Sequence, residues 1–391
     1  MASLVSITDR NSNNKGAQLS SPNQPIIFSF FSGSGFLDLG FEMSGFDVRF
    51  VNEFHEPFLE AYKYSREKMS LPEPEYGYYH GSIDDLVTGE KAEQLTALVL
   101  KAKKEALTGF IGGPPCPDFS VAGKNKGSAG DNGVLTRVYI DSIIKNQPDF
   151  FLFENVKGLW RTVKHRAFYE EMKVKLQESG YVLTDRLTNC IEFGVPQDRD
   201  RILMFGIHRK HVDPELSNEQ LSADFHWERE VKFVKADALD KSVWPQMSEY
   251  KENSKCQMPK HLAQFSELTV EHWFKKNEVS KHPNSKHHFK PYSDKFKTIQ
   301  EGDDSKKSFK RLHRFRYSPT AAYGNNEVHL HPYKSRRLSA AEALAIQSLP
   351  KDFQLPPTMT LSDMFKTIGN GVPYLASEAL AKTIRNYLAS L

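Results

Sequence analysis

The stretch IIFSFFSGSGF, residues 26–36, decides what fold the rest of the chain can adopt. Its first six residues are apolar apart from one serine, a pattern typical of a strand that is buried on both faces. Glycines at positions 33 and 35 then allow a turn, and Leu37 and Phe41 follow at the four-residue spacing of a helix face. The stretch therefore predicts a strand, a glycine turn and a helix, which is the repeating unit of an α/β protein.

The same alternation continues to about residue 208. Apolar runs predict further strands at VRFVNEF, LTGFIGG, DFFLFEN, YVLTDRLTN and RILMFGIH, and AFYEEMKVKLQESG has the spacing of a helix. Strands that alternate with helices indicate a parallel sheet. We predict four segments: a disordered tail at 1–24, an α/β domain at 25–208, a smaller irregular domain at 209–330, and a part at 331–391 that returns to the first domain.

The composition is typical of a globular protein. Of 391 residues, 39% are apolar and 26% are charged, and no apolar stretch has the length of a membrane span. The N-terminus lacks the basic start and apolar core of a signal peptide, so we expect a cytoplasmic protein. Three cysteines do not suggest a disulfide framework. We expect Cys190 and Cys256 to be small buried residues, and no C-x-x-C frame points to a metal.

The charge is unevenly distributed. The net charge is only +3, but residues 272–316 hold thirteen Lys and Arg against five Asp and Glu, with aromatic residues between them. One interpretation is a solvated basic face over a few core aromatics. The other is a surface for nucleic-acid phosphates, which becomes the better interpretation only if the rest of the chain needs such a substrate.

The first turn and the second strand together suggest a cofactor. Gly33 and Gly35 let a ligand approach the backbone closely at the start of a helix. The second strand ends in Glu53, which can accept hydrogen bonds from ribose hydroxyls, and in Phe54, which can stack on an adenine. A dinucleotide fits less well, because the third glycine of its fingerprint is replaced by Asp38. The pattern favours an adenosine with a small charged tail.

Three further positions can carry chemistry. Cys116 follows two prolines at a strand end and precedes a polar, glycine-rich stretch typical of a lid, which is the setting of a nucleophile. Glu154 ends the apolar strand DFFLFEN, and a carboxyl group among apolar neighbours can donate a proton to a ring nitrogen. In QDRDR, Arg199 and Arg201 alternate onto one face and can reach a carbonyl or a phosphate.

Taken in order, the motifs FSGSG, PPCPDFS, ENVKGL, GVPQDRDR, RRLSAAEALAIQSLP and KTIGNGVP resemble those of cytosine-5 DNA methyltransferases, over most of residues 26–390. The resemblance implies a Rossmann-like, S-adenosylmethionine-dependent methyltransferase sheet with helices on both faces, plus a target-recognition domain at 209–330. It implies methylation of C5 of cytosine in a specific double-stranded DNA sequence, through a covalent bond to C6 of a flipped-out base. A restriction-modification enzyme of this kind acts as a monomer and can have a cognate endonuclease.

The resemblance also implies a role for each matching residue. Cys116 would be the nucleophile, Glu154 would protonate N3, and Arg201, together with Arg199, would hold the cytosine. The cofactor would lie against Phe31, Gly33, Gly35, Glu53, Phe54, Ser82, Ile83, Asp84, Pro114, Asn370 and Gly371. DNA contacts would come from Ser120, Lys124, Lys306, Lys307, Arg311, Arg314 and Arg316.

Some positions depart from the family pattern, and alternatives stay open. Pro117 stands where the family usually has glutamine, Asn132 where many members have arginine, and Ser82 where an aspartate often holds the adenine, so that Ser82 or Asp84 takes this role. A transfer RNA methyltransferase is one alternative, although its C-F-T signature is absent. A non-catalytic DNA-binding relative and a nicotinamide-dependent oxidoreductase are the others, but the first would have lost Cys116, Glu154 or Arg201, and the second would not need them.

Overall fold

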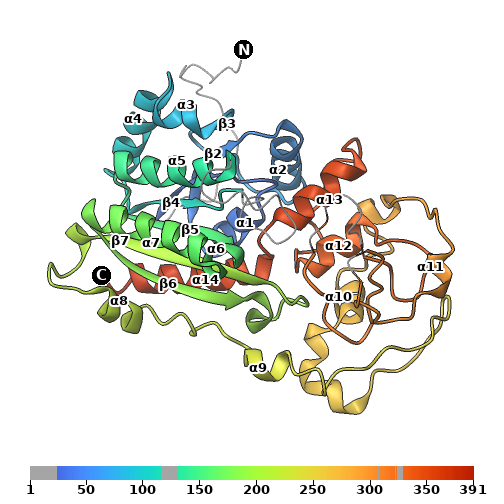
Figure 1. Ribbon diagram of the computed structural model, residues 1–391. Coiled ribbons are helices and arrows are strands. Elements are labelled where there is room, and N and C mark those ends of the chain that lie inside the picture. Colours follow the sequence, from blue (N-terminus) through green and yellow to red (C-terminus); the bar gives the residue numbers. More distant parts are fainter. Residues whose placement is uncertain (1–23, 116–130, 307, 322, 324–328) are drawn as a thin grey trace.

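The computed structural model describes residues 24–115, 131–306, 308–321, 323 and 329–391, and therefore leaves the predicted tail outside its description except for residue 24. A single seven-stranded sheet, in the order β3-β2-β1-β4-β5-β7-β6, forms the centre of the larger part of the molecule (Figure 1). The strands are β1 (Ile26–Phe30), β2 (Asp47–Glu53), β3 (Tyr78–His80), β4 (Thr108–Gly112), β5 (Phe150–Val156), β6 (Tyr181–Asn189) and β7 (Asp200–His208).

One strand runs against the others, which corrects the expectation of a purely parallel sheet. Strands β1 to β5 pair in parallel, but β7 is antiparallel to both β5 and β6. A parallel neighbour needs a crossover of a dozen or more residues, whereas β6 and β7 are joined by a short connection whose only helix is the 3₁₀ helix η2 (Cys190–Phe193). Because β7 is reversed, its first residues lie at the edge where β5 ends: Arg201 pairs with Val156.

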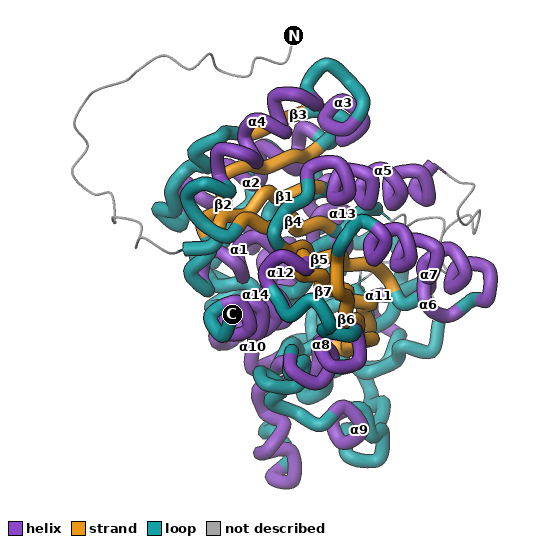
Figure 2. The backbone as a smooth tube through the Cα atoms, turned by 90° about the vertical axis from the view of Figure 1, so that its left-hand side faces the viewer, coloured by secondary structure: helices purple, strands orange, loops and turns teal. Residues whose placement is uncertain are grey.

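Helices cover both faces of the sheet, and Figure 2 shows the strands between the two sets. One face carries α3 (Ile83–Val87), α4 (Ala92–Ala102), α5 (Asp131–Asn146) and α7 (Val163–Glu178), with the short α6 (Gly158–Arg161) after β5. The other carries α1 (Phe36–Met43), α2 (Glu56–Lys68), α8 (Asn218–Asp224) and α14 (Tyr374–Leu388). Among the described residues, no helix is long and apolar enough to cross a membrane.

Both faces of each central strand are buried, which explains the continuous apolar runs in the sequence. In β5, Phe151 and Phe153 enter the core under α5 and α7, while Phe150 and Leu152 enter the core under α14. The alternation follows from the two-residue period of a strand.

A second, irregular part, made of the described residues of 228–330, forms what we call the small unit, on the right of Figure 1. Its short helices are α9 (Lys235–Ala238), η4 (Lys260–Leu268), α10 (Val270–Lys276), η5 (Pro283–Lys286) and α11 (Lys295–Thr298). Residues 209–227, which include η3 (Arg209–His211), lead back over the sheet, where Leu221, Phe225 and Trp227 join its core. The sheet domain therefore extends beyond the predicted boundary at 208.

The C-terminal part lies between the two units and then returns to the sheet. Helices α12 (Ala340–Ile346) and α13 (Leu361–Asn370) share a core with α10 of the small unit and with Phe36 and Leu39 of α1. Helix α14 packs on the sheet face beside α1. The C-terminal helices thus pack against α1, near the start of the described chain.

Two glycines of the central strands face aromatic rings of a neighbouring strand. Gly109 of β4 pairs with Phe150 of β5, and Gly206 of β7 pairs with Phe151 of β5. A Cβ atom on either glycine would overlap the paired ring. Both rings are fully buried between the sheet and its helices, so they have little room to move.

We predict that Gly206→Ala lowers the free energy of unfolding by about 1–3 kcal/mol, because the added methyl group overpacks a filled core. Urea denaturation followed by circular dichroism measures the change. Val174→Ala, at a half-exposed position of α7, is the control and should change stability by no more than about 0.5 kcal/mol. Equal stability of the two variants would contradict the prediction.

Candidate active site

The turn after β1 has the backbone conformation that its glycines suggest. Gly33 and Gly35 have positive φ angles of 57° and 78°, which glycine adopts without strain. A Cβ on Gly35 would come within 2.7 Å of Tyr62 and Arg66, whereas a Cβ on Gly33 would have no atom nearer than 4.0 Å. Phe31 also has a positive φ of 54°, which is strained for a bulky residue. Gly35 is therefore required by packing, while Gly33 leaves open space beside its backbone.

Glu53 ends β2 next to this turn. Its carboxylate accepts hydrogen bonds from the backbone N–H groups of Gly33 (2.7 Å) and His55 (2.8 Å). Burial raises the pKa of Glu53, and these hydrogen bonds offset part of the effect. The neighbouring Phe54 ring is 72% exposed, which leaves a large apolar surface in water. A buried carboxylate beside an uncovered ring matches the needs of a ribose and an adenine.

The residues predicted to hold the adenine lie beside Glu53. Asn52 donates a side-chain hydrogen bond to the Gly81 carbonyl (2.9 Å), which fixes the turn before α3. Ser82 caps α3 and also donates to the Asp84 carboxylate (2.7 Å), while Ile83 is buried in the core. Ser82 and Asp84 therefore act as one hydrogen-bonded pair at the rim of the site.

The end of the chain reaches the same turn. The hydroxyl groups of Ser34 and Thr367 lie 2.7 Å apart, and a Cβ on Gly371 would overlap the Phe36 ring. Asn370 is exposed at the tip of this C-terminal turn. The two segments that carry predicted cofactor residues, the turn after β1 and the end of α13, are thus in contact.

Arg199 holds that C-terminal turn from the inside. It is 1% exposed, and its guanidinium group donates to the backbone carbonyls of Gly369 (2.8 Å), Gly371 (3.0 Å) and Ala321 (3.3 Å). Burial and the nearby Arg201 lower the pKa of Arg199 to about 9. The donors of Arg199 are directed at the turn, which differs from the direct role in catalysis that its motif suggests.

Glu154 and Arg201 form an ion pair at the end of β5. The distance between Nε of Arg201 and Oε1 of Glu154 is 2.6 Å, and both side chains are about nine-tenths buried. The same guanidinium group donates from Nη1 to the backbone carbonyl of Asp200 (2.8 Å). The pair forms only because β7 is reversed, so that its start meets the end of β5.

The segment that leads to Cys116 lies against this pair. A Cβ on Gly113 would be 2.6 Å from Oε2 of Glu154, and the Asn155 side chain donates to the Pro114 carbonyl (3.4 Å). Oε2 of Glu154 therefore packs directly against the backbone of Gly113, and a side chain at this position would overlap it. Cys116 itself lies outside the described residues, as do Ser120, Lys124 and Lys307.

Two of the predicted DNA-binding arginines lie in the interior of the protein. Arg311 is fully buried and donates to the carbonyls of Phe296, Ile299, His331 and Lys334. Arg314 is buried in a bidentate ion pair with Glu301 (2.8 Å for both bonds). We correct the prediction that both residues contact DNA. The small unit has few helices and strands, so its buried polar groups take their hydrogen bonds from these guanidinium groups.

The other predicted positions of the small unit are closer to solvent. Lys306 is exposed. Arg316 is half-buried and donates to the Gly302 carbonyl (2.9 Å) and to Asp304 (3.0 Å). Of the two remaining cysteines, Cys190 is buried, which raises the pKa of its thiol to about 11, but Cys256 is exposed, contrary to expectation.

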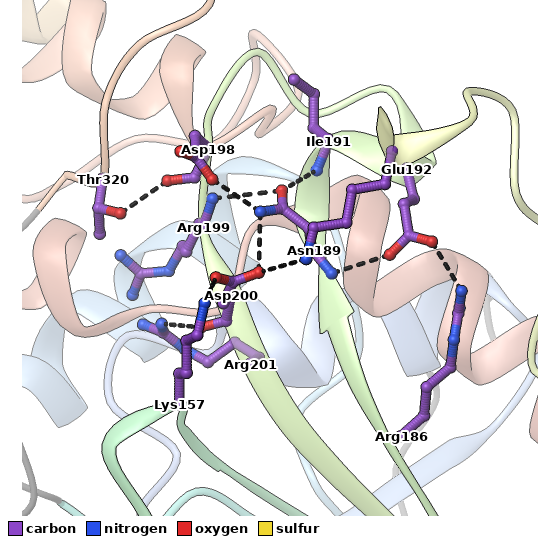
Figure 3. A network of polar contacts seen from close by, with 11 residues as sticks. Lys157, Arg186, Asn189, Ile191, Glu192, Asp198, Arg199, Asp200, Arg201 and Thr320 are labelled. Carbon is purple, nitrogen blue, oxygen red and sulfur yellow. Dashed lines mark hydrogen bonds and ion pairs between the residues drawn. The ribbon is translucent and has the colours of Figure 1, made fainter. Parts of the chain in front are cut away.

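Buried amide side chains connect the site and were not predicted from the sequence. Gln347 donates to the backbone carbonyls of Ile368 and Gly371 and accepts a hydrogen bond from Gln197 (3.1 Å). The side-chain oxygen of Asn189 accepts hydrogen bonds from the backbone N–H groups of Ile191 and Arg199 (Figure 3). The one available signal was the single glutamine in the apolar helix AAEALAIQSL, since a buried polar group needs a partner.

Solved structures with the same architecture define the class of fold. A putative DNA modification methyltransferase encoded within a prophage of E. coli superposes with a TM-score of 0.59 at 21% identity, covering 94% of this chain and 99% of that chain. The S. pombe Dnmt2 methyltransferase superposes with a TM-score of 0.57 at 12% identity, again over 94% of this chain and 99% of the other. The chain thus has a methyltransferase fold, and the predicted fold class is confirmed.

The family follows from sequence comparison. The family model of C-5 cytosine-specific DNA methylases matches residues 26–386. The Type II methyltransferase M.NmeDI of Neisseria meningitidis serogroup C is 56% identical over 98% of this chain and 88% of its own length. M.FnuDI of Fusobacterium nucleatum is 28% identical over 93% of this chain and 94% of its own length. The chain belongs to the C-5 cytosine-specific DNA methylase family and is a DNA cytosine-5 methyltransferase, which confirms the main prediction over the three alternatives.

We predict that Arg199→Lys lowers the free energy of unfolding by about 2–4 kcal/mol, because lysine leaves several buried carbonyls without a donor at about 1–3 kcal/mol each. Chemical denaturation measures the loss. Arg209→Lys is the matched control, since Arg209 also donates to two carbonyls, those of Pro214 and Leu216, but at an exposed position. If both variants lost the same stability, burial would not be the cause.

Proposed function

We propose that the chain methylates C5 of cytosine within a specific double-stranded DNA sequence, with S-adenosylmethionine as the methyl donor, as the modification enzyme of a restriction-modification system. The observation that carries the proposal is the buried Glu154–Arg201 pair beside the segment that leads to Cys116. The names of its relatives as Type II methyltransferases support the biological role.

The residues at the ends of β1 and β2 fit the cofactor. Glu53 offers carboxylate oxygens to ribose hydroxyls, the exposed ring of Phe54 offers a face for adenine, and Gly33 leaves room beside its backbone. When bound, S-adenosylmethionine supplies a methyl group made electrophilic by its sulfonium. The other residues proposed to line this site are Phe31, Gly35, Ser82, Ile83, Asp84, Pro114, Asn370 and Gly371.

The cytosine would lie at the edge of the sheet where β5 ends and β7 begins, after leaving the duplex, because its ring is otherwise inaccessible. Arg201 holds Oε1 of Glu154 and directs its remaining donors at the cytosine carbonyl. Oε2 of Glu154 packs against the backbone of Gly113, where a side chain would overlap it, and we propose that this oxygen faces N3 of the base. Arg199 acts indirectly, because it donates hydrogen bonds to backbone carbonyls of the turn that carries Asn370 and Gly371.

Chemistry then proceeds through a covalent adduct. The thiolate of Cys116 adds to C6, the electron pair of the C5–C6 bond is delocalised towards N3, and N3 takes a proton from Glu154. C5 becomes enamine-like and would take the methyl group, while the sulfur that carried it is left as a neutral thioether. A base would then remove the proton from C5, and the C6–S bond would break so that the thiolate leaves with its electron pair. N3 would return its proton to the Glu154 carboxylate, which restores the neutral 5-methylcytosine ring.

The small unit would supply contacts to duplex phosphates. Arg311 and Arg314 are excluded from this surface by their burial, whereas the exposed lysines of residues 272–316 remain available, among them Lys290 and Lys306. Phosphate contacts of this kind give affinity and orientation, while a smaller number of side chains read the bases. We propose that the protein acts as a monomer on cytoplasmic DNA, alongside an endonuclease for the same sequence.

We predict that DNA containing 5-fluorocytosine traps the protein, because a fluorine at C5 cannot leave as a proton after methyl transfer. When DNA is synthesised with 5-fluorodeoxycytidine triphosphate in place of the ordinary cytosine nucleotide, the cytosine of every recognition sequence carries fluorine. The covalent adduct is detected as a shifted band on a denaturing gel. Cys116→Ala should form no adduct with this DNA, and wild-type protein should form none with transfer RNA carrying the same base. An adduct with Cys116→Ala would refute the nucleophile, and one formed only on transfer RNA would refute the substrate.

We predict that Lys290→Glu with Lys306→Glu weakens duplex binding for all sequences and reduces the slope of log affinity against log salt by about 1–2. Fluorescence anisotropy at several salt concentrations measures the slope. The pair Lys101→Glu with Lys104→Glu, exposed at the end of α4, is the control and should leave the slope unchanged. A slope that stays the same in the first pair would remove these lysines from the DNA surface.

A further inference from the structure

The four residues 198–201 alternate in charge as Asp-Arg-Asp-Arg where β7 begins. Successive side chains of an extended chain point to opposite sides, so the two arginines and the two aspartates separate. Figure 3 shows Asp198 and Asp200 both bonded to Asn189, whose side-chain nitrogen donates to them over 2.7 and 3.0 Å. Asn189 is fully buried, so this contact fixes the segment from within.

The Asp200 carboxylate holds two lysines as well as Asn189. Lys157 lies 2.6 Å from Oδ2 and Lys235 lies 2.9 Å from Oδ1. Burial acts to raise the pKa of Asp200, but the three donors outweigh it and the pKa is lowered. Asp200 therefore stays ionised between the two lysines. We call Lys157, Asp200 and Lys235 the Asp200 bridge.

The bridge joins three parts of the molecule. Lys157 follows Glu154 by three residues at the end of β5, and Lys235 lies in α9, where the chain enters the small unit. Residues near the other end of the small unit are held by Asp198, two residues before Asp200: the Asp198 N–H donates to the Ser318 carbonyl (2.9 Å), and Thr320 donates to the Asp198 carbonyl (2.6 Å). Residues near both ends of the small unit are thus fastened to the segment where β7 begins.

The same peptide segment positions the ion pair. Nη1 of Arg201 donates to the backbone carbonyl of Asp200, while its Nε faces Glu154. The orientation of the Asp200 peptide therefore sets the place of the guanidinium group. Both lysines of the bridge are about 40% exposed, and exposed ion pairs add little to stability. The ion pairs of these two lysines therefore fix the position of Asp200 and contribute little to the stability of the fold.

We propose that Asp200 is a positioning residue that fixes Arg201 against Glu154, and that Lys235 links this pair to the small unit. The inference rests on the proposed roles of Glu154 and Arg201 and extends them to the side chains that hold them. The inference means that a shift of the small unit on DNA would pass through Lys235 and Asp200 and change the geometry of the Glu154–Arg201 ion pair.

The test uses single-turnover methylation of duplex DNA with saturating protein and radiolabelled S-adenosylmethionine. Asp200→Asn should lower the rate by about ten- to a hundredfold, since a displacement of about 1 Å can cost about a hundredfold in rate. Lys235→Met should lower the rate severalfold. Both variants should bind S-adenosylmethionine as tightly as wild type in calorimetry, and their melting midpoints should change by no more than about 2 °C.

Asp185→Asn is the matched control. Asp185 lies on β6, is as exposed as Asp200 (17%) and is also paired with a lysine, Lys173, so the loss of an equivalent ion pair there should leave the rate unchanged. A rate for Asp200→Asn that equals that of wild type or of Asp185→Asn would overturn the positioning role. A wild-type rate for Lys235→Met would overturn the link to the small unit.

A double-mutant cycle separates this inference from the proposed function. Glu154→Gln should reduce the rate severely, and adding Asp200→Asn should then cost less than twofold, because groups that act as a unit are not additive. Full additivity would show that Asp200 does not act through Glu154. Wild-type activity of Glu154→Gln would instead refute the role of Glu154, whatever the result for Asp200→Asn.

Discussion

The reversal of β7 is the constraint on which the site depends. In a sheet whose strands are all parallel, only the residues that follow each strand reach the carboxyl edge. Because β7 runs the other way, the residues that begin it arrive at that edge, and Arg201 comes opposite Val156. Glu154 at the end of one strand and Arg201 at the start of its neighbour can therefore form an ion pair with both backbones held in the sheet.

The segment QDRDR, residues 197–201, leads into β7, and its two arginines have different surroundings. Arg201 faces a carboxylate, whereas Arg199 is enclosed by backbone carbonyls of the C-terminal turn. A buried guanidinium group without a carboxylate partner is costly, and several hydrogen bonds to carbonyls offset that cost. Position within a motif did not reveal this division, because it depends on which segment of the chain closes over each side chain.

Local patterns predicted six of the seven strands and the place of Glu154 at a strand end, because burial on both faces leaves a visible apolar run. They missed β3, whose three residues are too short to form such a run. They did not predict the direction of β7, since an apolar run carries no record of strand direction. Charge was also a poor guide to exposure: Arg311 and Arg314 belong to the basic run but are internal supports. In an irregular unit, backbone carbonyls lack the partners that helices and strands provide, and arginine supplies them.

The two oxygens of Glu154 have different neighbours, and this difference resolves an apparent conflict in the proposed chemistry. A cation beside a carboxylate favours its charged form, yet the carboxyl group must deliver a proton. The permanently charged guanidinium group of Arg201 lies 2.6 Å from Oε1, which makes this oxygen an unfavourable site for a proton. In the proposed chemistry the proton that is given to N3 is therefore carried by Oε2, which packs against the backbone of Gly113. Under this proposal, the arginine that orients the carboxyl group would also determine the oxygen from which the proton is given.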